Sequence, residues 1–198
     1  MGLFFVVGVG IGIFFYLTGK SPEVPPPPPK SESLIVADEK ITLALTSQSR
    51  DEFGQKIQEA LERSLKEGNL RIILFDLEEG ESENLLKLGD FLKISGFKMP
   101  RRLEINLEDF TLGSLRQGGV IYPFIIFKVS SFEDSFAGIL FWEKTMVGEL
   151  RIIFKNLPAR EEALVAFQDK VVKNQDARVL EYEGRTLLAY NFFNKKLL

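Results

Sequence analysis

Acidic residues come closest, among the side chains of this sequence, to a catalytic or cation-binding set. Asp76 is followed closely by Glu78, Glu79, Glu81 and Glu83. Carboxylate oxygens bind hard cations, and a pair of carboxyl groups can perform acid–base chemistry. However, the spacing lacks the alternating Asp/Asn order and the glycine of a calcium-binding loop. Because runs of charge are usually solvated, we interpret these residues as an acidic surface loop.

Trp142 and Glu143 are the most distinctive residues of the remaining sequence. They lie on a predicted helix beside Phe141 and Met146. A tryptophan next to a charge can anchor a ligand or a partner protein. A tryptophan among apolar helical neighbours more often belongs to the core, and we favour that interpretation.

Four further patterns have structural explanations. The sequence RQGG at Arg116–Gly119 could contact an anion, but a hairpin turn accounts for it. Glu133–Asp134, and similarly Glu161–Glu162, suit the start of a helix, where the dipole favours negative charge. The stretch GVGIG at Gly8–Gly12 lacks the preceding strand and following helix of a dinucleotide-binding loop.

The residue types that are missing exclude several function classes. The chain contains 0 His and 0 Cys, the usual ligands of zinc, haem and iron–sulfur clusters. A Ser-His-Asp or Cys-His relay cannot be assembled from this chain alone. The net charge of −3 argues against a nucleic-acid-binding surface. We therefore predict no catalytic, cofactor-binding or metal-binding residues, no enzyme activity and no nucleic-acid partner.

Residues 1–20 have the composition of a membrane anchor. The apolar run Gly2–Thr18 carries no charge and would span roughly 26 Å as a helix, close to the ~30 Å of a hydrocarbon core. Lys20 can reach the interface from its end. Because a basic start and a small-residue cleavage site are both missing, we predict a retained transmembrane helix rather than a signal peptide. Its partner is the lipid bilayer, through residues 2–18.

Residues 21–40 read as a proline-rich linker. Pro25–Pro29 favour a polyproline II helix, which rises about 3.1 Å per residue and is stiff. We interpret it as a stalk that holds the following domain away from the bilayer. Docking of the P-x-x-P pattern to an SH3-like groove is the alternative.

The remainder, residues 41–198, predicts one α+β domain with an antiparallel or mixed sheet and packed helices. Alternation predicts a strand over 41–46, and Ser49 with Glu52 forms a capping box for a helix over 50–67. A second strand follows over 70–77. This order is the outline of a split β-α-β unit.

Further elements follow along the domain. Helical spacing predicts a helix over 82–97 ending near Gly96, a short helix over 100–107, and a helix over 130–148 capped by Ser130 and Glu133. Strands are predicted over 110–116 and 120–129, with Pro123 marking an edge or a bulge. Residues 149–154 fit either helix or strand, and 158–162 a loop or helix start. Further strands are predicted around turns at Glu183–Gly184 and 194–196.

The order of these elements resembles that of uncharacterised single-pass membrane-anchored proteins of small-genome bacteria. The apolar anchor, PPPPP, ITLALTSQSRDEF, the hairpin FTLGSLRQGG…FIIFKV and LFWEKTM carry the resemblance. It implies an extracytoplasmic α+β domain on a stalk, and no function. It also implies further structure after the last residues, and the apolar end at Leu197–Leu198 indicates a domain cut short there.

These observations predict a membrane-anchored envelope protein with a non-enzymatic interaction or scaffold domain. Envelope proteins are the expected partners, and the oligomeric state stays open. Two alternatives remain: a subunit of a pilus or secretion-type assembly, and a carboxylate-dependent glycan hydrolase, which would need two facing carboxyl groups in a cleft.

Overall fold

The computed structural model describes residues 33–47, 49–77, 85–155, 157, 166–193 and 198. Contacts group Ser33–Leu198 into one compact unit. The predicted anchor (residues 1–20) and the proline run lie outside the described residues. Within the ranges just given, no helix is both long and apolar enough to cross a membrane.

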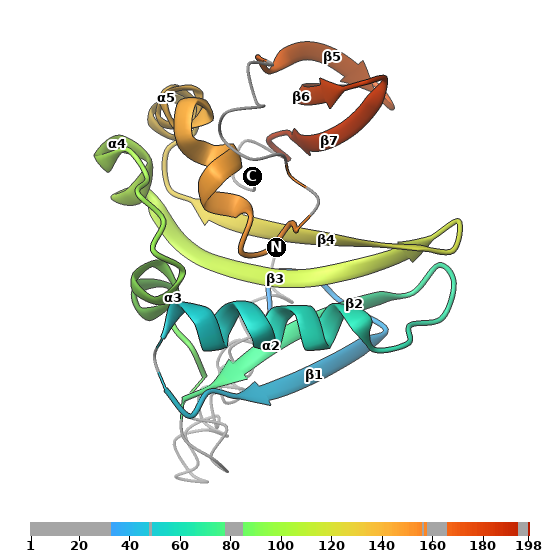
Figure 1. Cartoon of the computed structure of the whole chain (residues 1–198). Helices are drawn as coiled ribbons and strands as arrows, with labels where there is room; N and C mark the ends of the chain where they lie inside the picture. The colour runs from blue at the N-terminus through green and yellow to red at the C-terminus, as the bar shows by residue number, and fades with distance from the viewer. Residues whose placement is uncertain (1–32, 48, 78–84, 156, 158–165, 194–197) are drawn as a thin grey trace, which may run out of the picture. The chain divides into compact units, whose positions relative to one another are not determined.

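The domain begins with a strand–helix–strand unit (Figure 1). Strand β1 (Glu39–Ala44) leads through helix α2 (Arg50–Glu62) to strand β2 (Leu70–Asp76), and the strands pair in parallel from Glu39↔Arg71 to Ala44↔Asp76. Because β1 and β2 are direct neighbours, the unit is an ordinary βαβ. The prediction of a split β-α-β unit was wrong in this respect: β3 pairs on the far side of β2 instead of between the two strands.

Helix α2 begins as the sequence predicts and ends earlier. The Ser49 hydroxyl accepts a hydrogen bond from the Glu52 backbone N–H, and Phe53, Ile57 and Ala60 are buried. The Glu52 side chain, however, does not complete a capping box but binds the preceding Thr46. The helix stops at Glu62 instead of residue 67, because the carbonyls of its last turn and of the residues after it bond to arginine side chains from the sheet, described below.

Two short helices connect β2 to a long hairpin. Helix α3 (Leu88–Ser95) ends at Gly96, which adopts the left-handed conformation at φ 66°. It starts six residues later than predicted, because Leu85 is drawn into a β-bridge with Asp76. Helix α4 (Arg101–Glu104) is a single turn and does not reach residue 107, where β3 begins.

Strands β3 (Leu107–Gln117) and β4 (Val120–Val129) complete the sheet in the order β1-β2-β3-β4. Gly118 and Gly119 make the turn with φ of 60° and 78°, values that favour glycine. Pro123 lies in β4 opposite Ser114. The prediction that Pro123 marks an edge strand is confirmed, because β4 is the last strand of this sheet.

Helix α5 (Phe132–Leu150) follows the hairpin directly. Its N-cap is Ser131, whose hydroxyl accepts from the Asp134 N–H, so the predicted Ser130–Glu133 cap is displaced by one residue. Ser130 is used elsewhere, because its N–H and hydroxyl both donate to Asn106. At the other end, the residues after Leu150 turn and form neither of the two predicted continuations.

A separate three-stranded antiparallel sheet ends the domain, in the order β5-β6-β7. Its strands are β5 (Gln168–Val172), β6 (Gln175–Tyr182) and β7 (Arg185–Tyr190). The Glu183–Gly184 turn was predicted, whereas β5 and its turn at Lys173–Asn174 were not. Together the two sheets and the helices confirm the α+β class.

The four-stranded sheet and the three-stranded sheet share one hydrophobic core. On the four-stranded sheet it is rich in phenylalanine: Phe91 of α3 lies with its ring centroid 4.1 Å from that of Phe110 and 5.8 Å from that of Phe53. Aromatic pairs at these separations add to the free energy of burial. From the second sheet, Leu180 and Leu188 belong to the same core.

Candidate functional site: an apolar groove beside an open sheet edge

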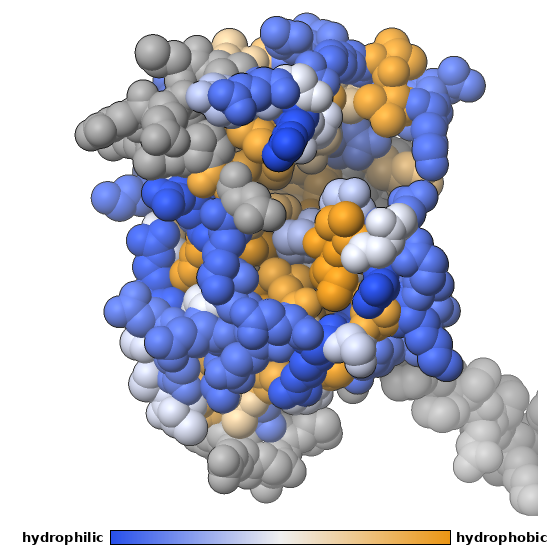
Figure 2. All heavy atoms as spheres, turned by 45° about the vertical axis from the view of Figure 1, so that its right-hand side comes forward, coloured by the Kyte–Doolittle hydropathy of each residue, from blue (hydrophilic) through white to orange (hydrophobic). Residues whose placement is uncertain are grey.

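An apolar groove of about 660 Å³ lies between strand β4, helix α5 and strand β7. Figure 2 shows hydrophobic side chains gathered in a hollow and framed by hydrophilic ones. The lining residues that matter below are Tyr122, Ile125, Trp142, Met146, Leu188 and Tyr190. Apolar hollows of this size commonly bind ligands or partner segments.

One wall of the groove is strand β4, whose outer edge meets no further strand in the part of the chain that the structure describes. The backbone of Phe127 in β4 exchanges two hydrogen bonds with Leu198: Phe127 N–H donates to the Leu198 carbonyl at 2.8 Å, and Leu198 N–H donates to the Phe127 carbonyl at 2.9 Å. Such a reciprocal exchange is the hydrogen-bonded pair of an antiparallel ladder. The edge of β4 therefore already pairs with the backbone of Leu198 at one end.

Trp142 forms part of the inner wall. Its side chain is buried, and its indole Nε1 donates to Oε2 of Glu149 at 2.9 Å. The same oxygen accepts from the Lys98 backbone N–H at 2.6 Å, so Glu149 links α5 to the segment between α3 and α4. The prediction of a core tryptophan is confirmed. The sequence did not indicate that this core residue also lines a groove.

Glu143 fixes the opposite wall. Its carboxylate accepts hydrogen bonds from Nε and Nη2 of Arg178, both at 2.8 Å, and from the Tyr190 hydroxyl at 2.6 Å. Arg178 also donates to Asp169 at 3.0 Å. These four residues, which we call the Glu143 cluster, come from α5, β5, β6 and β7. The cluster ties the second sheet to α5 and sets the width of the groove.

The electrostatics of the Glu143 cluster favour its present charges. The hydrogen bonds from Arg178 to Glu143 raise the pKa of this guanidinium above its ordinary value. Burial, reinforced by the hydrogen bond to Glu143, raises the pKa of the Tyr190 hydroxyl well above 10. Tyr190 is thus held as a neutral donor, and the arrangement serves to position the wall rather than to move protons.

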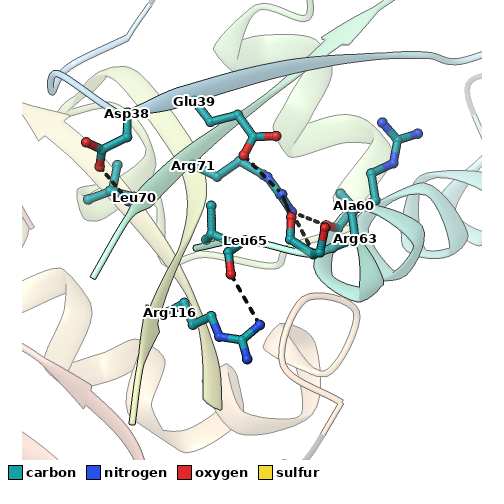
Figure 3. A network of polar contacts seen from close by, with 9 residues as sticks. Asp38, Glu39, Ala60, Arg63, Leu65, Leu70, Arg71 and Arg116 are labelled. Carbon is teal, nitrogen blue, oxygen red and sulfur yellow. Dashed lines mark hydrogen bonds and ion pairs between the residues drawn. The ribbon is translucent and has the colours of Figure 1, made fainter. Parts of the chain in front are cut away.

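A second group of arginines organises the far end of α2 (Figure 3). Arg71 of β2 is 1% exposed, and its guanidinium donates to the carbonyls of Ala60, Arg63 and Ser64. It also pairs with Glu39 at 3.2 Å. A cation at a helix C-terminus satisfies carbonyls that lack helical partners. The sequence signal is an arginine inside an otherwise apolar strand, which we did not single out.

A polar groove lies beside the apolar one, between α2 and the end of α5. Its carboxylates, Asp51, Glu59 and Glu62, all come from α2, whereas the α5 side contributes Arg151 and Lys155. Of these carboxylates, only Glu62 also reaches the apolar groove. Glycan hydrolysis needs two carboxyl groups facing each other across the substrate. Neither groove offers that arrangement among the described residues.

The acidic residues that the sequence analysis singled out lie outside the described residues, at the end of β2 or at the start of α5. Glu78, Glu79, Glu81 and Glu83, with Glu161–Glu162, lie outside the described residues, and Asp76 is buried at the end of β2. Asp134 is at the start of α5, as expected, where Arg102 lies 3.4 Å away. No group of acidic residues arranged for a metal occurs in the part of the chain that the structure describes.

The RQGG turn does contact an anion, and the chain itself supplies it. Gly118 N–H donates to one oxygen of Glu67 at 2.5 Å and Gly119 N–H to the other at 3.2 Å. Arg116 lies 3.6 Å from the same carboxylate. The hairpin turn and anion contact therefore coexist, and both are structural.

Comparisons of this chain with protein-family models, with curated proteins and with solved structures found no match.

Proposed function

We propose that this protein is a non-enzymatic interaction module whose apolar groove binds an apolar segment of a partner protein. The observation that carries this proposal is the groove itself, an apolar hollow of about 660 Å³ next to an open strand edge. Its walls are fixed by the Glu143 cluster and by Glu149, so the site is formed before a partner arrives. A preformed site loses less conformational entropy on binding.

The proposal extends to the location of the protein. The composition of residues 1–20 supports a membrane anchor, and the proline run supports a stalk, which would present the groove to other envelope proteins outside the cytoplasm. Protease treatment of intact cells tests this. Cleavage of the domain in intact cells is expected, and cleavage only after lysis would refute the orientation.

Trp142 provides a direct reporter of binding, because it is the single tryptophan of the chain and lines the groove. We suggest titrating the full chain, in lipid nanodiscs, with two apolar peptides that carry 4-bromophenylalanine, one helical and one extended. The bromine quenches tryptophan emission on contact. Saturable quenching by either peptide supports the proposed function.

Leu188→Glu provides the control for specificity, because it places a charge in the wall of the groove at a position that is 8% exposed. Burial of an unpaired carboxylate is unfavourable, so we expect binding to weaken by about tenfold or more. Arg185→Glu, at an exposed position of the same strand that does not line the groove, should change binding little. Quenching that does not saturate, or that ignores Leu188→Glu, would refute a specific groove.

A further inference from the structure

We infer that the partner segment binds as an extended β-strand, antiparallel to β4, along the edge from Ile125 to Ile121. This inference rests on the proposed function and specifies its binding mode. Its starting point is the hydrogen-bonded pair between Phe127 and Leu198, in which the backbone of one residue already occupies a position of the same edge.

The register of the hairpin identifies the backbone groups that a partner strand would meet. Along an antiparallel strand, residues alternate between bonding to one neighbour and to the other. Since Phe127 points its N–H and carbonyl away from β3, Ile125 and Ile121 do the same, whereas Tyr122 and Phe124 bond to β3. No described residue bonds to the outward groups of Ile125 or Ile121.

Pro123 agrees with this alternation. It lies between Ile121 and Ile125 and shares their outward position, where its missing N–H removes nothing from the ladder with β3. The edge therefore offers donors at Ile121 and Ile125 and carbonyl acceptors at all three residues. An incoming strand can satisfy these groups by main-chain hydrogen bonds, the mode known as β-augmentation.

The surroundings of the edge set the chemistry of the strand. Side chains opposite Ile125 and Ile121 would share the face on which Ile125 and Phe127 pack against the core. There they would meet the apolar groove, whereas their sequence neighbours would face away. The edge thus fits a peptide of alternating apolar and polar residues, about six long, that lies antiparallel to β4.

The test uses eight-residue peptides of alternating valine and threonine with one central 4-bromophenylalanine at a valine position. Their binding to the full chain in nanodiscs is measured by quenching of Trp142. Methylating the amide nitrogens of the valines blocks the hydrogen bonds to β4, so affinity should fall by at least about tenfold. Methylating the threonine amides instead, which face away from β4, should leave it within about twofold.

Matched protein variants test the same contact from the other side. Ile121→Pro removes an outward donor, and Ile121→Ala removes a similar part of the side chain while keeping that donor. We expect Ile121→Pro to bind the extended peptide about fivefold more weakly than Ile121→Ala. Unchanged Trp142 emission in the free variants confirms that the groove is intact.

Each outcome separates the inference from the proposed function. Equal losses for the two methylated peptides, or for the two Ile121 variants, would overturn strand addition. Quenching by the helical peptide alone would keep the proposed function and overturn the inference, whereas quenching by neither would refute both. A dimer of the full chain that Ile121→Pro dissociates would assign the edge to a second copy and overturn a separate partner.

Discussion

One carboxylate oxygen of Glu143, Oε1, accepts hydrogen bonds from both Nε of Arg178, at 2.8 Å, and the hydroxyl of Tyr190, at 2.6 Å. The other carboxylate oxygen of Glu143, Oε2, accepts a hydrogen bond from Nη2 of Arg178 at 2.8 Å. The side chains of Arg178 and Glu143 are 19% and 15% exposed. One carboxylate of α5 therefore joins two strands of the second sheet, and its removal would leave a poorly solvated guanidinium.

Glu143→Ala should lower the free energy of unfolding by about 3 kcal/mol, because Arg178 loses its mostly buried partner and keeps only the exposed carboxylate of Asp169. Urea denaturation followed by Trp142 emission measures this. Lys170→Met, which breaks the surface pair of Lys170 with Glu181 at 2.6 Å, should cost less than about 1 kcal/mol. Equal losses for the two variants would show that the Glu143 cluster does not hold the second sheet.

Arg71→Met should destabilise the domain by about 3 kcal/mol, because three carbonyls near the end of α2 lose their donor. Arg116→Met is the matched control: Arg116 is more exposed, donates to one carbonyl, that of Leu65, at 3.2 Å, and makes a surface ion pair with Glu67, so about 1 kcal/mol is expected. Urea denaturation compares the two. A loss as small for Arg71→Met as for Arg116→Met would contradict the capping role.

The loop before α2 should respond to acid through Glu52. Hydrogen bonds lower the pKa of the Glu52 carboxyl to about 2, with the largest contribution from the Ser47 side chain and the next from Thr46. A lowered pKa stabilises the fold above the unfolded value of 4.5, and this contribution is lost as the pH falls from 4.5 towards 2. NMR titration of the side-chain carboxyl carbon measures the midpoint. In Glu52→Gln this part of the pH dependence should disappear, and a midpoint near 4.5 in the unaltered chain would refute the contact.

Two glycines of α5 should respond in opposite directions to alanine. At Gly138 an added Cβ would lie 2.7 Å from Cβ and 2.8 Å from N of Leu103, so Gly138→Ala should destabilise by about 2–3 kcal/mol. At Gly148 nothing lies within 4 Å, and Gly148→Ala should stabilise by about 0.5–1 kcal/mol through helix propensity. Thermal unfolding measures both. A stabilising Gly138→Ala would show that α4 does not pack against α5 at this point.

Local patterns predicted much of the fold because they record local physics. The strand over 70–77, the Ser49 cap and the glycines at Gly118–Gly119 each depend on a few neighbouring residues, and each is found in the structure. The predictions fail where contacts between residues distant in the sequence decide the structure. Helix α2 ends at Glu62 because Arg71, from another element, takes its carbonyls, and the pairing of β1 with β2 depends on the whole sheet.

The candidate site was harder to predict, for the same reason. Trp142 and Glu143 stood out by residue type, but their partners Glu149, Arg178 and Tyr190 come from later in the chain or from another sheet. Strand β5 was missed because its exposed, polar sequence lacks an apolar face. No sequence pattern predicts a groove, because a groove exists only where separate elements meet.

Pro123 has a consequence for the behaviour of the protein at high concentration. It lacks a donor midway along the open edge of β4, so copies that met edge to edge could not form an unbroken ladder there. Long, regular edges are the templates from which sheets grow into fibrils. The same residue that leaves room for one short partner strand thus protects the protein against self-propagating aggregation.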